Sequence, residues 1–210
     1  MLELEAVTIR VGARVLVPAL TARVAAGEVL AVMGASGSGK SSLLGYLCGT
    51  LPPSLEGAGR VRVDGREVQR LPTEERRIGI LFQDDLLFPH MSVLENLLFA
   101  LPAASPAPRV AAAEAALAHA GLAGYGARRP GTLSGGQRAR VSVLRALLAG
   151  PRALLLDEPF SRLDTALRER FRAFVFEQLR ERAIPAVLVT HDEADVPVGA
   201  RVVRLAHDDD

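Results

Sequence analysis

A glycine-rich loop in the first quarter of the chain has the residue types that bind a chain of phosphates. Residues 34–41 fit the pattern G-x-x-x-x-G-K-[ST] in full. In such a loop the glycines let backbone N–H groups face the phosphates, the lysine contacts the β- and γ-phosphates, and the last hydroxyl binds Mg²⁺. The candidate phosphate-binding residues are Gly34, Ala35, Ser36, Gly37, Ser38, Gly39, Lys40 and Ser41.

The lysine of this loop stands out in the composition. Of the 25 basic residues, 24 are arginine, and Lys40 is the only lysine. A lysine ammonium is a compact charge on a flexible stem that can reach between two phosphates, whereas a guanidinium is a broad planar fork. This choice of residue favours a nucleotide-binding loop over a glycine-rich loop without a ligand.

Two adjacent carboxylates form a second candidate group. Four apolar residues, 153–156, precede Asp157 and Glu158. A buried strand of this kind delivers its following residues to the carboxyl edge of a sheet, where open α/β sheets bind ligands. Asp157 can hold Mg²⁺ through a water, and Glu158 can orient or deprotonate an attacking water. The alternative is an exposed strand end before the turn at Pro159.

The elements that must position these groups alternate between strand and helix. Apolar runs predict strands, and capping and breaker residues predict helix ends. Alternating strands and helices imply an α/β fold with a mostly parallel sheet covered on both faces. Strands are predicted within 2–33 and over 78–82, 153–157, 186–190 and 201–205, with a hairpin over 61–68. Helices are predicted over 40–47, 92–101, 109–120, 135–149 and 164–180, and a breaker segment at 102–108 separates the second from the third.

Composition narrows the class of protein. A length of 210 residues fits one domain, or a domain with a subdomain. The net charge of +1 and the absence of a basic run argue against a nucleic-acid partner. The single cysteine, Cys48, excludes an internal disulfide and fits a reducing cytosol. No apolar run approaches the ~18 residues that span a bilayer, so work at a membrane would need another chain for the spanning part.

A third motif identifies a family. Residues 133–137 read Leu-Ser-Gly-Gly-Gln and precede a long helix. Alone, they are an ordinary helix N-cap with flexible flanks. Between the loop lysine and the acidic strand end, however, they resemble the signature of the nucleotide-binding subunits of ABC transporters. Gln83, the run Ser161–Asp164 and His191 match further motifs in the order of that family, and the resemblance covers nearly the whole chain.

The resemblance implies an architecture. The fold would be a P-loop NTPase core with a mostly parallel sheet, an N-terminal antiparallel β subdomain and a helical insertion subdomain. Residues 1–210 would form a single ABC ATPase domain, with the core and the β subdomain in about 1–82 and 134–210 and the helical subdomain in about 83–133.

The resemblance also implies roles. Two copies would face each other head to tail with two ATP molecules between them. Asp164 would contact the opposite subunit. Each role has a simpler alternative: Gln83 as an exposed loop amide, Asp164 as a helix N-cap, and His191 as a satisfied strand-end histidine. The implied catalytic residues are Glu158, His191, Gln83 and Lys40. The residues implied to bind Mg²⁺ are Ser41, Gln83 and Asp157. The signature residues implied to act on the ATP of the partner copy are Ser134, Gly135, Gly136 and Gln137.

Two positions depart from the family pattern. The family usually places an aromatic residue about 25 positions before the lysine, where it stacks on adenine, and here that position is Val11. Weaker ATP binding and poorer discrimination of adenine from guanine are therefore expected. Ser42 stands in the phosphate-binding set where threonine is common, which is a conservative change.

Residues 82–97 resemble the corresponding segment of bacterial importer ATPases, which lines a groove for a short permease helix. The implied groove floor is Leu86, Leu87, Phe88 and Met91, with packing inside the insertion's own core as the alternative. The implied partners are a second copy, a transmembrane permease and an external solute-binding protein, with the chain at the cytoplasmic face of the inner membrane. The competing interpretation is a soluble ABC-type ATPase that acts on ribosomes or DNA.

Overall fold

The structure, a computed structural model, describes residues 1–205, and residues 206–210 lie outside the described part. The chain forms two compact units. The core unit consists of Met1–Ile80, Arg152–Glu158 and the chain from Phe176 onward. The helical unit consists of Leu81–Pro151 and Pro159–Val175.

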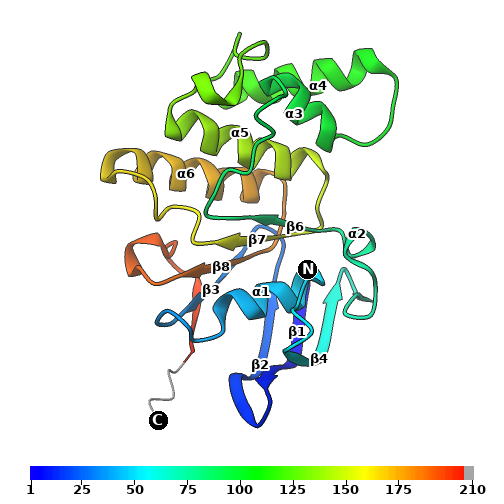
Figure 1. Ribbon diagram of the computed structural model, residues 1–210, viewed down its shortest axis with the longest axis vertical. Helices are drawn as coiled ribbons and strands as arrows, with labels where there is room; N and C mark the ends of the chain where they lie inside the picture. The colour runs from blue at the N-terminus through cyan, green and yellow to red at the C-terminus, as the bar shows by residue number, and fades with distance from the viewer. Residues whose placement is uncertain (206–210) are drawn as a thin grey trace. The chain divides into compact units, whose positions relative to one another are not determined.

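A parallel sheet carries the core unit (Figure 1). Its pairings β7–β8, β8–β3 and β3–β9 are all parallel, as the α/β interpretation predicts. All of β8 and four of the five residues of β7 are buried, which fits a sheet covered on both faces. The strands stand in the order β6 (Ile78–Leu81), β7 (Ala153–Asp157), β8 (Ala186–Thr190), β3 (Val29–Met33) and β9 (Arg201–Arg204).

An antiparallel sheet forms the N-terminal part of the core unit, as expected. Its strands stand in the order β2 (Arg14–Val24), β1 (Leu2–Val11), β4 (Glu56–Val63) and β5 (Arg66–Glu67), and β4 and β5 form the predicted hairpin. Helix α1 (Lys40–Cys48) contacts β7. One apolar cluster joins these parts, with Leu2 from β1, Leu43 from α1 and Leu155 from β7 all fully buried.

A buried arginine closes the end of α1. Arg76, in the short helix α2 (Thr73–Arg76), is 7% exposed. Its guanidinium donates to the carbonyls of Tyr46 at 2.7 Å and Leu47 at 3.0 Å, and also to those of Leu71 and Gln69. The last carbonyls of a helix have no partner within the helix, so Arg76 satisfies two of those of α1. Burial lowers the pKa of Arg76.

The helical unit packs α3 (Val93–Ala100), α4 (Pro106–His119) and α5 (Gly135–Leu148) around a second apolar cluster (Figure 1). Helix α3 begins with the predicted capping box of Ser92 and Glu95. Helix α4 begins at Pro106, inside the segment predicted to break helices, because a proline in the first turn lacks only an N–H that would have no helical partner. Helix α6 (Thr165–Glu181) starts in this unit.

Short 3-10 turns at Pro130–Thr132 and Glu193–Asp195 complete the described chain. Within residues 1–205 there is no helix with the length and apolar character that crossing a membrane requires.

Candidate functional site

The loop between β3 and α1 has the conformation that its glycines predict. Gly37 and Gly39 have φ angles of 82° and 88°, in the left-handed region that favours glycine. A Cβ on Gly34 would lie 2.9 Å from the Leu205 carbonyl oxygen. The loop therefore has a backbone conformation that requires glycine at positions 34, 37 and 39.

Lys40 lies across its own loop. The residue is 6% exposed, and its Nζ donates to the carbonyls of Gly34 at 2.7 Å and Ala35 at 2.8 Å. Two residues earlier in the loop, the buried Oγ of Ser38 has no hydrogen-bond partner within the described chain. A buried hydroxyl without a partner is rare, because leaving it unsatisfied is costly. An ammonium and an unsatisfied hydroxyl in one loop suit an anionic group such as phosphate, and Ser41, the residue after Lys40, is exposed.

Three strands bring the remaining core-unit residues to the same edge. Asp157 of β7 pairs with Val189 of β8, and Met33 of β3 pairs with Thr190. Because the strands are parallel, the phosphate loop, Glu158 and His191 all follow the carboxyl ends of adjacent strands. The carboxyl edge of the sheet was predicted for Asp157 and Glu158, and the parallel register of β7 and β8 places them there.

Two carboxylates and a histidine interact at this edge. Burial and the Glu158 carboxylate raise the pKa of Asp157, and the Lys40 ammonium opposes the shift. Glu158 Oε2 lies 3.2 Å from His191 Nδ1, and the His191 side chain is 59% exposed. A desolvated carboxylate with a second carboxylate beside it gains from a cation, so this pair suits a divalent metal next to a phosphate.

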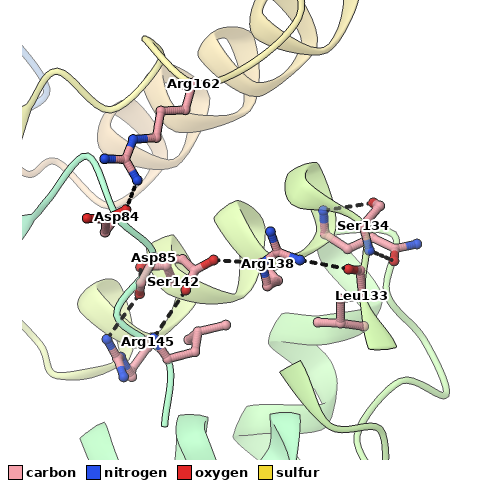
Figure 2. Close-up of polar contacts among 10 residues, drawn as sticks. Asp84, Asp85, Leu133, Ser134, Arg138, Ser142, Arg145 and Arg162 are labelled. Atoms are coloured by element: carbon pink, nitrogen blue, oxygen red, sulfur yellow. Dashed lines mark hydrogen bonds and ion pairs between the residues drawn. The ribbon is translucent and has the colours of Figure 1, made fainter. Parts of the chain in front are cut away.

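The signature residues begin α5 in the helical unit (Figure 2). Ser134 is the N-cap, and its Oγ and the Gln137 side chain form a reciprocal capping box. Ser134 and Gly135 are exposed, whereas Gly136 is buried and a Cβ there would lie 2.5 Å from the Leu167 side chain. The signature thus presents an exposed helix N-terminus.

Gln83 and Asp164 also lie in the helical unit. Gln83 is exposed, and its Nε2 donates to Ser161 Oγ at 2.9 Å. Asp164 Oδ1 accepts the Leu167 N–H at 3.0 Å, which is the N-cap contact that the simpler alternative predicts for it. The contact of Asp164 with a second subunit stays a prediction.

The four residues predicted to floor a groove have different environments. Leu87 is 8% exposed and belongs to the apolar core of the helical unit. Leu86 is 53% exposed, and Phe88 and Met91 are half-buried. The ring of Phe88 meets that of Phe99 edge-on at 4.9 Å, and Phe99 is 65% exposed. Phe99 was not among the predicted residues, because one phenylalanine in an apolar helix does not show which face it takes.

Val11 ends β1 and is 39% exposed, opposite Arg14 in the β1–β2 hairpin. Stacking of a base on an aromatic side chain contributes about 1–3 kcal/mol in nucleic-acid complexes. We expect Val11→Tyr to strengthen ATP binding by about 5- to 150-fold at 1.4 kcal/mol per tenfold. Titration calorimetry with ATP and with GTP measures this, and the gain should be absent in Val11→Leu. Equal ATP affinities for Val11→Tyr and the unaltered chain would contradict the assignment of the adenine position.

The chain is similar to known ATP-binding proteins. The family model described as ABC transporter matches residues 18–161. The uncharacterized ABC transporter ATP-binding protein YnjD of Escherichia coli K12 is 51% identical over 86% of this chain and 83% of its own length. The thiamine import protein ThiQ of Cereibacter sphaeroides is 44% identical over 93% and 83%. The Fe(3+) ions import protein FbpC 1 of Rhizobium meliloti is 40% identical over 92% of this chain but 55% of its own length.

A solved structure has the same fold. The ATP-binding cassette MJ0796, described as a dimeric post-hydrolysis state bound to ADP and Pi, matches with a TM-score of 0.78. The match is 31% identical in sequence and covers 98% of this chain and 94% of that one.

Proposed function

This chain belongs to the ABC transporter family of ATP-binding, ATP-hydrolysing proteins, and from this premise we propose that it powers a bacterial importer of a small solute as a head-to-tail homodimer. The observation that carries the proposal is that the phosphate loop, Glu158 and His191 follow the carboxyl ends of adjacent strands at one edge of the parallel sheet.

Residues of this edge, together with Gln83 of the helical unit, are assigned different roles in hydrolysis. Lys40 and the loop N–H groups hold the β- and γ-phosphates, and Ser41, Gln83 and Asp157 would hold Mg²⁺, with Asp157 acting through a water. Mg²⁺ held there would neutralise negative charge on the phosphates. Glu158 accepts the proton of the attacking water, and His191 donates a hydrogen bond to the γ-phosphate. The partnerless Ser38 Oγ and the desolvated Asp157 support this assignment.

The partner copy completes each site. Ser134 and Gly136 at the start of α5 contact the γ-phosphate held by Lys40 of the other copy, with Gly135 and Gln137 shaping the turn. The exposed N-terminus of α5 supports this arrangement, because its partial positive charge attracts an anion. The dimeric state described for MJ0796 is in keeping with it.

The exposed apolar area of the helical unit, formed by the exposed Leu86 and Phe99 with the half-buried Phe88, is the proposed contact for a transmembrane permease. Met91 borders it, whereas Leu87 supports it from the core. The chain would then work as a peripheral subunit on the cytoplasmic face of the inner membrane, with a solute-binding protein outside and no nucleic-acid partner. The import functions named for ThiQ and FbpC 1 support transport over a role on ribosomes or DNA.

A concentration series tests the shared sites. Each site needs Ser134 of a second copy, so the ATPase rate per chain should rise with chain concentration until the dimer is saturated. Light scattering on the same samples reports the state of association, and a series with EDTA in place of Mg²⁺ is the control for metal dependence. A rate per chain that stays constant while the protein remains monomeric would rule out the two-copy site.

A further inference from the structure

One face of α5 makes three polar contacts with Asp85, which lies in the segment that carries Gln83, here called the Gln83 segment (residues 82–91). Arg138, Ser142 and Arg145 are spaced four and three residues apart, which places them on the same side of a helix. All three contact Asp85, two residues after Gln83 (Figure 2). Asp85 is not among the residues that the family motifs point to.

The contacts use both the side chain and the backbone of Asp85. Its Oδ2 accepts from Arg138 Nε at 2.8 Å, with both side chains about one-third exposed. Its carbonyl oxygen accepts from Ser142 Oγ at 2.8 Å and from Arg145 Nη2 at 3.4 Å. A charged donor and acceptor in this geometry make a strong hydrogen bond.

Arg138 links Asp85 to the signature. While Nε binds the Asp85 carboxylate, Nη1 donates to the Leu133 carbonyl at 3.0 Å, directly before Ser134 (Figure 2). Because a guanidinium is rigid and planar, the contact of Arg138 with Asp85 and its contact with the Leu133 carbonyl hold a fixed orientation relative to each other. One side chain therefore connects the Gln83 segment with the start of the signature.

Arg145 extends the connection toward the exposed apolar area. Its Nη1 lies 3.4 Å from Asn96 Oδ1, and its guanidinium lies 5.2 Å from the centre of the Phe88 ring. Asn96 is fully buried, accepts the Phe88 N–H at 2.9 Å and donates to the Phe88 carbonyl at 3.1 Å. Phe88 is thus held by Asn96 of α3, and Arg145 of α5 contacts both residues.

Leu87 is packed in the apolar core of the helical unit, but polar contacts, rather than close packing, set the position of the preceding part of the segment, residues 82–85. A cavity of about 140 Å³ lies against it within the helical unit. Its lining includes Gln83, Asp85, Arg138 and Ser142. A segment beside unfilled space can shift when a polar contact is lost, because no neighbouring side chain blocks the movement.

We propose that Asp85 is a positioning residue for ATP hydrolysis, which fixes Gln83 relative to Ser134 through Arg138. This inference rests on the proposed function, because it assigns Gln83 and Ser134 to the reaction. The neighbouring Asp84 serves as a contrast. It pairs with Arg162 instead, and both of those side chains are more than half exposed, where an ion pair contributes little.

The first test is Asp85→Asn, which keeps the shape of the side chain and removes its charge. We expect kcat for ATP hydrolysis to fall about tenfold, in line with the loss of one charge-assisted hydrogen bond. The Kd for ATP should stay within about twofold, because Lys40 and its loop lie in the other unit. Asp84→Asn makes the same change one residue away and should change kcat by less than about twofold.

A double-mutant cycle with Arg138→Gln tests the contact itself. Arg138→Gln alone should also lower kcat, and adding Asp85→Asn to it should lower kcat by less than about twofold more. Fully additive losses, an equal loss in Asp84→Asn, or a raised Kd with unchanged kcat would overturn the inference. Full activity in Asp85→Asn beside an active unaltered chain would overturn this inference alone, whereas an inactive unaltered chain would overturn the proposed function as well.

Discussion

Replacing Glu158 with glutamine lowers the ATPase rate by about 10²- to 10⁴-fold, the range expected for loss of a general base, and leaves a dimer loaded with ATP. Glutamine has nearly the shape of glutamate but cannot accept the proton of the attacking water. The ATP then persists between the two copies, and each γ-phosphate continues to hold both of them. In the proposed mechanism, hydrolysis removes that shared contact and lets the dimer open.

Size-exclusion chromatography with light scattering, with and without MgATP, measures this result. At a concentration at which the unaltered chain is a monomer with MgATP, Glu158→Gln is expected to be a dimer with MgATP and a monomer without it. Glu193→Gln is the matched control, because Glu193 is 75% exposed and pairs with Arg204. Full turnover in Glu158→Gln would refute the assignment of the base, and a monomer at saturating ATP would show that the isolated chain cannot close.

Removing the only lysine should have the largest effect on nucleotide binding. Hydrogen bonds to charged groups contribute about 1.5–3 kcal/mol each. If Lys40 contacts two phosphates, Lys40→Met should weaken ATP binding by about 10²- to 10⁴-fold. Lys40→Arg should restore little of this, because the site is buried and its two carbonyls, at 2.7 and 2.8 Å from Nζ, are spaced for a compact ammonium.

Titration calorimetry with ATP compares these variants. Arg60→Met is the control for loss of one positive charge, since Arg60 lies on the exposed side of β4 and pairs with Glu5. Its ATP affinity should equal that of the unaltered chain. Normal affinity in Lys40→Arg would show that charge alone suffices and that the choice of lysine has another cause.

The parts of the site that depend on local pattern could be predicted from the sequence. The glycine loop before α1, the carboxylates after β7 and the capping box at Ser92 each reside in fewer than ten consecutive residues, and all three have the expected structure. Parallel pairing then brings the glycine loop and the carboxylates to one edge of the sheet, because alternating strands and helices leave few other arrangements.

The parts that depend on distant partners could not be predicted. Nothing in the sequence separates Arg76, which caps α1 from 30 residues away, from the other 23 arginines. Asp84 and Asp85 are identical in type and adjacent, yet they pair with arginines 78 and 53 residues further along the chain. Leu87 was predicted for a groove floor but lies in the core, since a run of apolar residues does not reveal which one turns inward.

Glu158 also has an unusual backbone. Its φ angle is +45°, in the left-handed region that non-glycine residues rarely adopt, and its N–H is tied to the Val189 carbonyl at 3.0 Å. A strained backbone of this kind typically costs on the order of 1–3 kcal/mol. A glycine here would relieve the strain and abolish the base. Selection for a durable fold and selection for turnover therefore act in opposite directions on this residue, and the glutamate persists only while turnover matters to the cell.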